Sequence, residues 1–224
     1  MAFLTAKTDA ASIKESGNSK FINASGIYPV TVLAPFVDVS KNGSKSVNFL
    51  IEHDGQQQTI YSNLTIFNNN GSDNTIGQET LNKLLIIKGI DDIADPVDMA
   101  LPVGKEGAEV DCAVLEDLCD IECYIKIQMQ YSMYNGNIQE RKAVTGFYAA
   151  NKASAYEIVN EEEAGTQFAK DEVYASKNSY KDGLDEEQVN AWIAAKRPKG
   201  TAGGASAAKK PNAFNKPKRF GAKD

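Results

Sequence analysis

This 224-residue chain has few histidines and cysteines, the residue types that most often provide nucleophilic sites and zinc ligands. It has one histidine, His53, in the run Glu52-His53-Asp54-Gly55, and three cysteines, Cys112, Cys119 and Cys123. A Cys/His zinc site would need all four side chains, and a nucleophilic site would have to use His53. His53 stands where a strand is expected to enter a turn, and the cysteines are typical of small apolar residues in or near a strand. We therefore expect no catalytic site, no metal and no cofactor.

Carboxylates are the remaining candidates for enzymatic chemistry. A two-metal nuclease needs carboxylates that converge from different elements. The acidic runs of this chain are more typical of solvated loops, and the glycine patterns of phosphate-binding loops are absent. The sequence therefore favours a non-enzymatic protein over a nuclease that would use Asp91, Asp92, Asp95 and Asp98, or Asp111, Glu116, Asp117 and Asp120.

The formal net charge of −6 is distributed unevenly. Residues 1–156 hold 12 Lys and Arg against 19 Asp and Glu, and residues 157–196 hold 4 against 10. Residues 197–224 hold 8 against 1 and contain few large apolar side chains. We expect this basic tail to be disordered, because it cannot bury enough apolar surface to offset its ordering entropy. Such a tail is typical of a segment that binds a polyanion, or of a plain linker.

The composition also indicates the kind of cellular compartment in which the protein is expected. Three cysteines are an odd and small number, which favours a reducing environment over a disulfide scaffold. We expect no secretory signal at the N-terminus and no membrane segment, because the apolar runs are far shorter than the ~20 residues that a spanning helix needs.

Hydrophobic patterning predicts five strands and two helices. The clearest strand, 122–134, alternates apolar and polar residues throughout. Asn135-Gly136 turns the chain into a partner strand over 137–148. Three strands joined by short glycine turns are expected over 26–37, 47–52 and 59–67, with Pro29 and Pro35 favouring an edge, a bend or a bulge over a flat central strand in the first. Helices are predicted over 76–88, ended by Gly89, and over 186–196, capped by Asp185.

This order of elements predicts a mainly β fold: a five-stranded OB-like barrel with one helix between strands 3 and 4. The expected organisation is a flexible arm at 1–25, the barrel at 26–156, an acidic segment with a short C-terminal helix at 157–196, and the disordered basic tail at 197–224. Tyr28, Phe36 and Phe49 are assigned to the core.

Single-stranded nucleic acid binding needs cations in a groove and aromatic rings that face solvent. Both occur on the polar side of the strand at 122–134 and on neighbouring elements. The predicted nucleic-acid-binding residues are Lys41, Lys45, Tyr61, Phe67, Tyr124, Lys126, Tyr134, Arg141, Lys142 and Tyr148. The tail adds Lys209, Lys210, Phe214, Lys216, Lys218, Arg219 and Phe220. The net negative charge of residues 1–156 does not oppose this reading, because only the groove has to be basic.

The chain resembles bacteriophage single-stranded DNA-binding proteins of replication modules. The resemblance is carried by Gly26-Ile27-Tyr28-Pro29-Val30-Thr31-Val32, by the turn Ser40-Lys41-Asn42-Gly43-Ser44-Lys45 and by the strands around Asn135-Gly136. It implies an OB-fold protein that coats exposed strands during phage replication and recombination, in the cytoplasm of an infected bacterium. It also implies polymerase or helicase as replisome partners, recruited through an acidic C-terminal tail. Here the acidic stretch is internal and the tail is basic, which puts that recruitment in doubt.

One alternative stays open from the sequence. The acidic segment, the helix at 186–196 and the tail are also typical of an adaptor that folds onto a protein partner in a phage replication or assembly complex. The sequence does not fix the oligomeric state.

Overall fold

The computed structural model describes residues 21–196, apart from the side chain of Asn63. Its elements, in chain order, are β1 (Gly26–Val39), β2 (Lys45–His53), β3 (Gln56–Phe67), α1 (Thr75–Lys88), β4 (Val97–Leu101), η1 (Lys105–Gly107), β5 (Val110–Val114), η2 (Glu116–Leu118), β6 (Ile121–Tyr134), β7 (Asn137–Ala149), α2 (Ala155–Val159), α3 (Thr166–Glu172), β8 (Ser179–Tyr180) and α4 (Glu186–Lys196). No helix within 21–196 is both long enough and apolar enough to cross a membrane.

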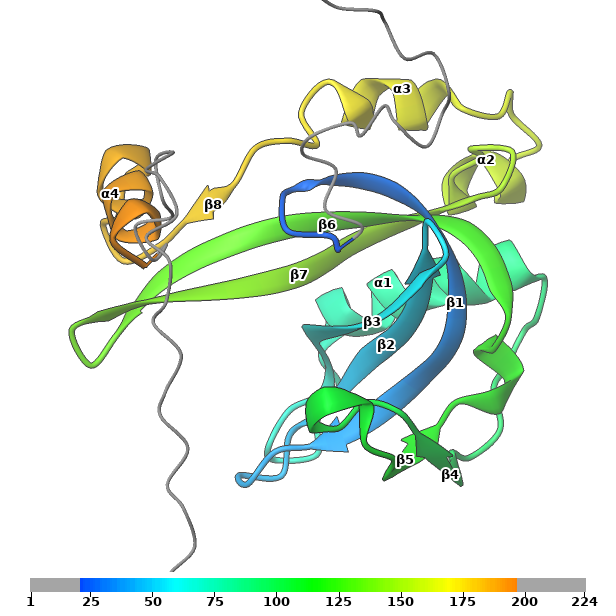
Figure 1. Ribbon diagram of the computed structural model, residues 1–224. Coiled ribbons are helices and arrows are strands. Elements are labelled where there is room, and N and C mark those ends of the chain that lie inside the picture. The colour runs from blue at the N-terminus through cyan, green and yellow to red at the C-terminus, as the bar shows by residue number, and fades with distance from the viewer. Residues whose placement is uncertain (1–20, 197–224) are drawn as a thin grey trace, which may run out of the picture.

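The protein is mainly β, and its sheet curls into an antiparallel half-barrel (Figure 1). β1 is the central strand, because one edge pairs with β2 while the other pairs first with β6 and then with β5. The bulge in β1, between Val32 and Ala34, lies between the two prolines, as predicted, but the alternative of an edge strand is wrong, because β1 pairs along both edges. At the ends of the curl β7 lies against β3, and no ladder joins these two strands in the part of the chain that is described.

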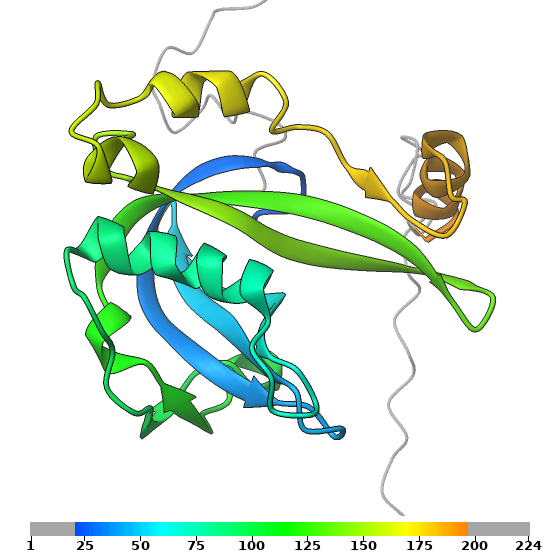
Figure 2. The ribbon, with the colours of Figure 1, turned by 180° about the vertical axis from the view of Figure 1, so that it is seen from behind.

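The main core fills the inside of the curl, where alternate residues of five strands meet. Phe49 and Phe147 approach from opposite walls, with ring centroids 5.5 Å apart. α1 covers the core with Leu81 and Leu84, and Figure 2 shows it lying across the half-barrel. Phe49 and Phe36 are buried and Tyr28 packs against the core, so all three predicted core aromatics are confirmed.

The start of α1 is fixed tightly against β3. The Asn74 side chain caps the helix by accepting from the Gly77 N–H, and Gly89 ends it in a left-handed conformation. A Cβ at Gly77 would lie 1.8 Å from the carbonyl oxygen of Thr65, so only glycine allows this approach. The predicted helix at 76–88 is therefore confirmed, together with the glycine that ends it.

Two parts of the sheet differ from the five strands predicted. Residues 91–119 form the hairpin β4–β5, which covers a second small core of Ala34, Phe36 and Leu50. β8 adds a two-residue parallel pairing to β6, so the sheet has eight strands. The sequence missed these strands because they are short and half-exposed, and their apolar pattern is weak.

Described residues from the segments on either side of the half-barrel pack against the sheet. In the expected flexible arm, Ile22 is buried in the main core and its N–H donates to Gln58. In the acidic segment, α4 packs Val189 and Trp192 against Tyr131 on the extended β6–β7 hairpin (Figure 1). Asp185 caps α4 by accepting from the Gln188 N–H, as predicted.

Candidate nucleic-acid interface

A hollow of about 300 Å³ lies where β3 and β7 come together without pairing. β3 contributes Thr59 and Tyr61 to its lining, and β7 contributes Glu140, Arg141 and Lys142. Three residues predicted from sequence to bind nucleic acid, Tyr61, Arg141 and Lys142, are thus brought together from two strands. Thr59 and Glu140 were not predicted.

Tyr61 presents an aromatic ring at this hollow. It is 56% exposed, although it lies in the middle of a strand. Its hydroxyl donates to the carbonyl oxygen of Val103, at 2.9 Å, which anchors the far end of the ring. A ring held in this way can stack against a base without losing much side-chain freedom.

The two cations of β7 differ in their surroundings. Arg141 is exposed, and its Nη2 donates to Gln139 at 3.2 Å. Lys142 is half-buried, and burial lowers the pKa of its ammonium group, an effect that Glu140 opposes. Glu140 itself accepts from the Tyr131 hydroxyl at 3.1 Å. Burial, together with this carboxylate, raises the pKa of Tyr131 to about 12, so the hydroxyl stays a donor at neutral pH.

A second group of predicted residues lies at the β1–β2 turn. Lys45 is directly opposite Phe67 in the β2–β3 ladder, and its ammonium nitrogen lies 5.7 Å from the centre of that ring. Lys41 is exposed in the same turn, which is closed by a hydrogen bond from the Ser40 N–H to the Ser44 carbonyl. Phe67 is six residues from Tyr61 on β3, about 20 Å along the strand. These residues therefore form a separate cationic and aromatic edge.

Tyr134 stands alone at the tip of the β6–β7 hairpin and is 61% exposed. Asn135 and Gly136 both have positive φ there, which makes the two-residue turn expected for Asn-Gly. The tail residues predicted to contact nucleic acid, 209–220, lie outside the described residues.

The prediction that Tyr124, Lys126 and Tyr148 form an open face is wrong. α3 lies over them, and its Phe168 packs edge-on against Tyr124 and Tyr148, with ring centroids 5.0 and 5.2 Å apart. Tyr148 is only 4% exposed. The alternation on β6 correctly separated its two faces, but it contained no information on what covers the polar one.

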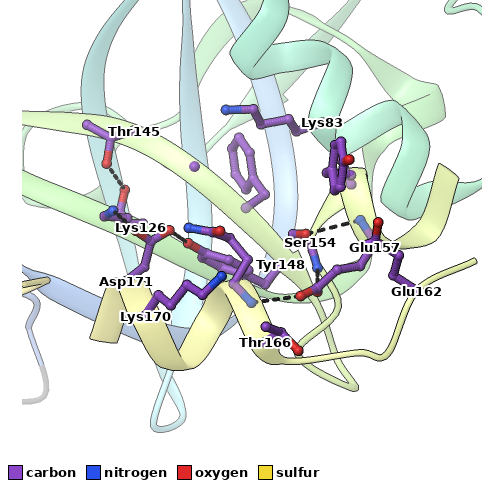
Figure 3. Close-up of a pocket in the computed structure, with 15 residues that line it drawn as sticks. Lys83, Lys126, Thr145, Tyr148, Ser154, Glu157, Glu162, Thr166, Lys170 and Asp171 are labelled. Atoms are coloured by element: carbon purple, nitrogen blue, oxygen red, sulfur yellow. Dashed lines mark hydrogen bonds and ion pairs between the residues drawn. The ribbon is translucent and has the colours of Figure 1, made fainter. Parts of the chain in front are cut away.

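Asp171 of α3 neutralises this covered face. Its carboxylate lies 3.1 Å from the Lys126 ammonium nitrogen and accepts from the Tyr148 hydroxyl (Figure 3). Burial alone would raise the pKa of Asp171, but the hydrogen bonds from Tyr148 and Lys126 outweigh it and hold that pKa below its usual value. Burial and the same carboxylate raise the pKa of Tyr148. Phe168 and Asp171 are one turn apart on α3, so both side chains reach the same face of β6 and β7.

α3 is in turn held by a buried carboxylate, Glu157. Ser154 and Glu157 form a capping box at the start of α2. The Glu157 carboxylate also accepts from the N–H groups of Gly165 and Gln167, at 3.2 and 2.7 Å. Hydrogen bonds from backbone N–H groups lower the pKa of Glu157 despite its burial. The Ser-x-x-Glu spacing is a capping signal that can be recognised in the sequence.

The residues weighed for catalysis take structural positions. His53 Nδ1 lies 2.8 Å from the carbonyl oxygen of Pro29, and its ring packs edge-on to Tyr28. Cys112 and Cys123 are buried in different cores, and burial raises the pKa of both thiols. Within residues 21–196, no three His, Cys, Asp or Glu side chains are grouped so that they could hold a metal ion.

Comparison with the models of known protein families finds none that matches this chain, and comparison with curated proteins finds no match either.

Proposed function

We propose that this protein binds single-stranded DNA, largely without sequence preference and without catalysing a reaction. The bases would stack on exposed rings, and lysine and arginine side chains would contact the phosphates. The hollow between β3 and β7 carries the proposal, because an exposed, anchored ring at Tyr61 stands beside the cations Arg141 and Lys142. A role in phage replication or recombination is a prediction that rests on the sequence resemblance alone.

The strand arrangement supports an OB-like barrel as the finer description of the fold. In the order β3-β2-β1-β6-β7, the first and last strands lie side by side, as a closing barrel requires. α1 follows the third strand and covers the seam between β3 and β7. β4 and β5 are then an insertion between this helix and the strand that an OB fold would number fourth.

Fluorescence anisotropy of a labelled oligothymidylate, titrated with the full chain at low and high salt, tests the proposal. Tyr61→Ala is expected to weaken binding by about 5- to 150-fold, the equivalent of about 1–3 kcal/mol for one stacked base. Tyr61→Phe keeps the ring and should bind nearly as the wild type does. Tyr174→Ala is the matched control, because Tyr174 is 61% exposed but lies beyond α3.

Strong salt dependence with a selective loss in Tyr61→Ala supports the proposal. No binding by the wild-type chain refutes it, and an equal loss in Tyr174→Ala refutes the assignment of the site.

Exposed apolar residues favour one alternative, a protein-interaction adaptor. Tyr156 and Val159 of α2 and Val173 and Tyr174 after α3 are all more than half exposed, beside the acidic run 161–163. Such a surface suits a basic partner with apolar side chains, such as a replisome protein. It would be favoured if the anisotropy titration showed no DNA binding.

A further inference from the structure

The hollow at Tyr61 is the first of three that follow one another along β7. The second, of about 380 Å³, lies between β7 and the start of α1. The third, of about 350 Å³, lies between β7, α1, α2 and α3. Arg141 lines the first and second hollows, and Thr145 lines the second and third. The three hollows are therefore neighbours along β7.

The third hollow, at the far end of this series, is lined by Lys83 and Lys170. Figure 3 shows Lys83 reaching the third hollow from α1 and Lys170 reaching it from α3, on opposite sides. Neither makes an ion pair with any residue in the described part of the chain. Lys126, the third lysine of this hollow, is already neutralised by Asp171.

Most carboxylates along the series are already satisfied. Glu140 accepts from Tyr131, Glu157 is buried under backbone N–H groups, and Asp171 is bound by Lys126 and Tyr148. Glu162 is the carboxylate at the third hollow for which the described residues provide neither an ion pair nor a side-chain hydrogen bond. Glu157 accepts hydrogen bonds but has no ion pair among the described residues, so its negative charge also remains at this hollow. Lys83 and Lys170 therefore share this end with the carboxylates Glu157 and Glu162.

The middle hollow joins the two ends without adding negative charge. Its polar lining consists of neutral side chains and Arg141. It lies at the first turn of α1, a helix of 14 residues whose N-terminal end carries partial positive charge. Nothing in this stretch would repel a phosphate.

We propose that the DNA site extends along the β7 edge, from Tyr61 and Lys142 at one end to Lys83 and Lys170 at the other. This inference rests on the proposed function. From Arg141 to Tyr148 the strand rises about 23 Å, at about 3.3 Å per residue. A path of this length suits the lower part of the range of about 4 to 16 nucleotides that one OB-like domain binds.

Substitution of the two far lysines tests the path. The variant with both Lys83→Gln and Lys170→Gln is compared with a control carrying Lys105→Gln and Lys177→Gln, which has the same net charge but lies off the path. All four side chains are exposed, so both variants should fold as the wild type does, which circular dichroism checks. Anisotropy titrations over a salt series use labelled oligothymidylates of about 4 and about 12 nucleotides.

For the longer oligonucleotide, the test variant should bind several-fold more weakly than the control. Its plot of log affinity against log salt should be shallower by about 1.4, from about 0.7 for each of two lost phosphate contacts. The shorter oligonucleotide is about as long as the path, so it should show the same difference between the two variants. Glu162→Gln should strengthen binding of the longer oligonucleotide.

The outcomes separate the two proposals. If the wild type binds and Tyr61→Ala weakens binding, but the test variant behaves like its control, the path is overturned and the proposed function stands. If the wild type binds neither oligonucleotide, both are overturned.

Discussion

Asp171→Asn is the substitution that best separates the structural role of α3 from its effect on charge. The side chain keeps its shape and one carbonyl oxygen, but it loses the negative charge that Lys126 and Tyr148 now share. The side chains of Lys126 and Asp171 are 25% and 27% exposed, so this ion pair is neither on the open surface nor fully buried. The substitution therefore weakens two contacts without opening a cavity.

The expected cost follows from that intermediate burial. A hydrogen bond to a charged group contributes about 1.5–3 kcal/mol when protected, and an exposed ion pair contributes about 0–1 kcal/mol. Because asparagine can still accept from Tyr148, we expect a loss of about 1–2 kcal/mol in the free energy of unfolding. For a chain of this size, that loss lowers Tm by about 2 to 8 °C.

The pH dependence of stability tests whether the negative charge of Asp171 causes this loss. The pKa of Asp171 is lower in the folded protein than its usual value, so its contribution is complete at neutral pH and is lost as the pH falls through the folded pKa. The difference between wild type and Asp171→Asn should therefore begin to shrink below about pH 4, near the usual pKa of an aspartate, and should vanish as the pH falls through the lower folded pKa. Urea unfolding at several pH values measures this.

Glu172→Gln is the matched control, because it makes the same change in net charge at the next residue, which is exposed. It should leave stability within about 0.5 kcal/mol of the wild type. If the two substitutions cost the same at neutral pH, the reasoning from the Asp171 contacts is refuted. If the proposed function holds, Asp171→Asn also frees Lys126 and should steepen the salt dependence of DNA binding by up to about 0.7 relative to Glu172→Gln.

Three further predictions concern the scaffold. Gly77→Ala should destabilise the protein by at least about 3 kcal/mol in urea unfolding, because its Cβ would overlap the carbonyl oxygen of Thr65. Glu157→Gln should flatten the loss of stability at pH values below the usual pKa of a glutamate, since the lowered pKa of Glu157 in the folded protein makes its contribution disappear as the pH falls. Val189→Ala should cost α4 about 2 kcal/mol of docking free energy, and a red shift in the emission of Trp192, the chain's only tryptophan, should report the loss of α4 before the barrel unfolds.

The barrel strands could be predicted because their patterns are local. Thirteen alternating residues and an Asn-Gly turn specify β6 and the start of β7, and the observed ladder runs from Cys123 opposite Ala149 to Tyr134 opposite Asn137. α1 could be predicted for the same reason, since its cap and its terminating glycine are adjacent to it in sequence.

The site could be predicted only in part, because it depends on which elements cover which face. Tyr124, Lys126 and Tyr148 have the residue types of an open binding face, and only the docking of Phe168 and Asp171 shows that they are covered. A helix of seven residues is too short for its apolar periodicity to predict which strand it will pack against. Lys83 and Lys170 were missed because their position relative to β7 comes from tertiary packing.

The two ends of β6 and β7 consequently differ in what they can bind. At one end α3 covers the polar face with an aromatic ring and satisfies its lysine with a carboxylate. At the other end the hairpin extends beyond the barrel, α4 covers the face that bears Tyr131, and Arg141 stays exposed. The polar side chains at the covered end of β6 are therefore not free to bind a polyanion while α3 is in place. The hollows along β7 offer another path: the first two lie where β3 and β7 meet without pairing, and the third adds Lys83 and Lys170, which make no ion pair with the described residues. For this reason we locate the DNA path along β7.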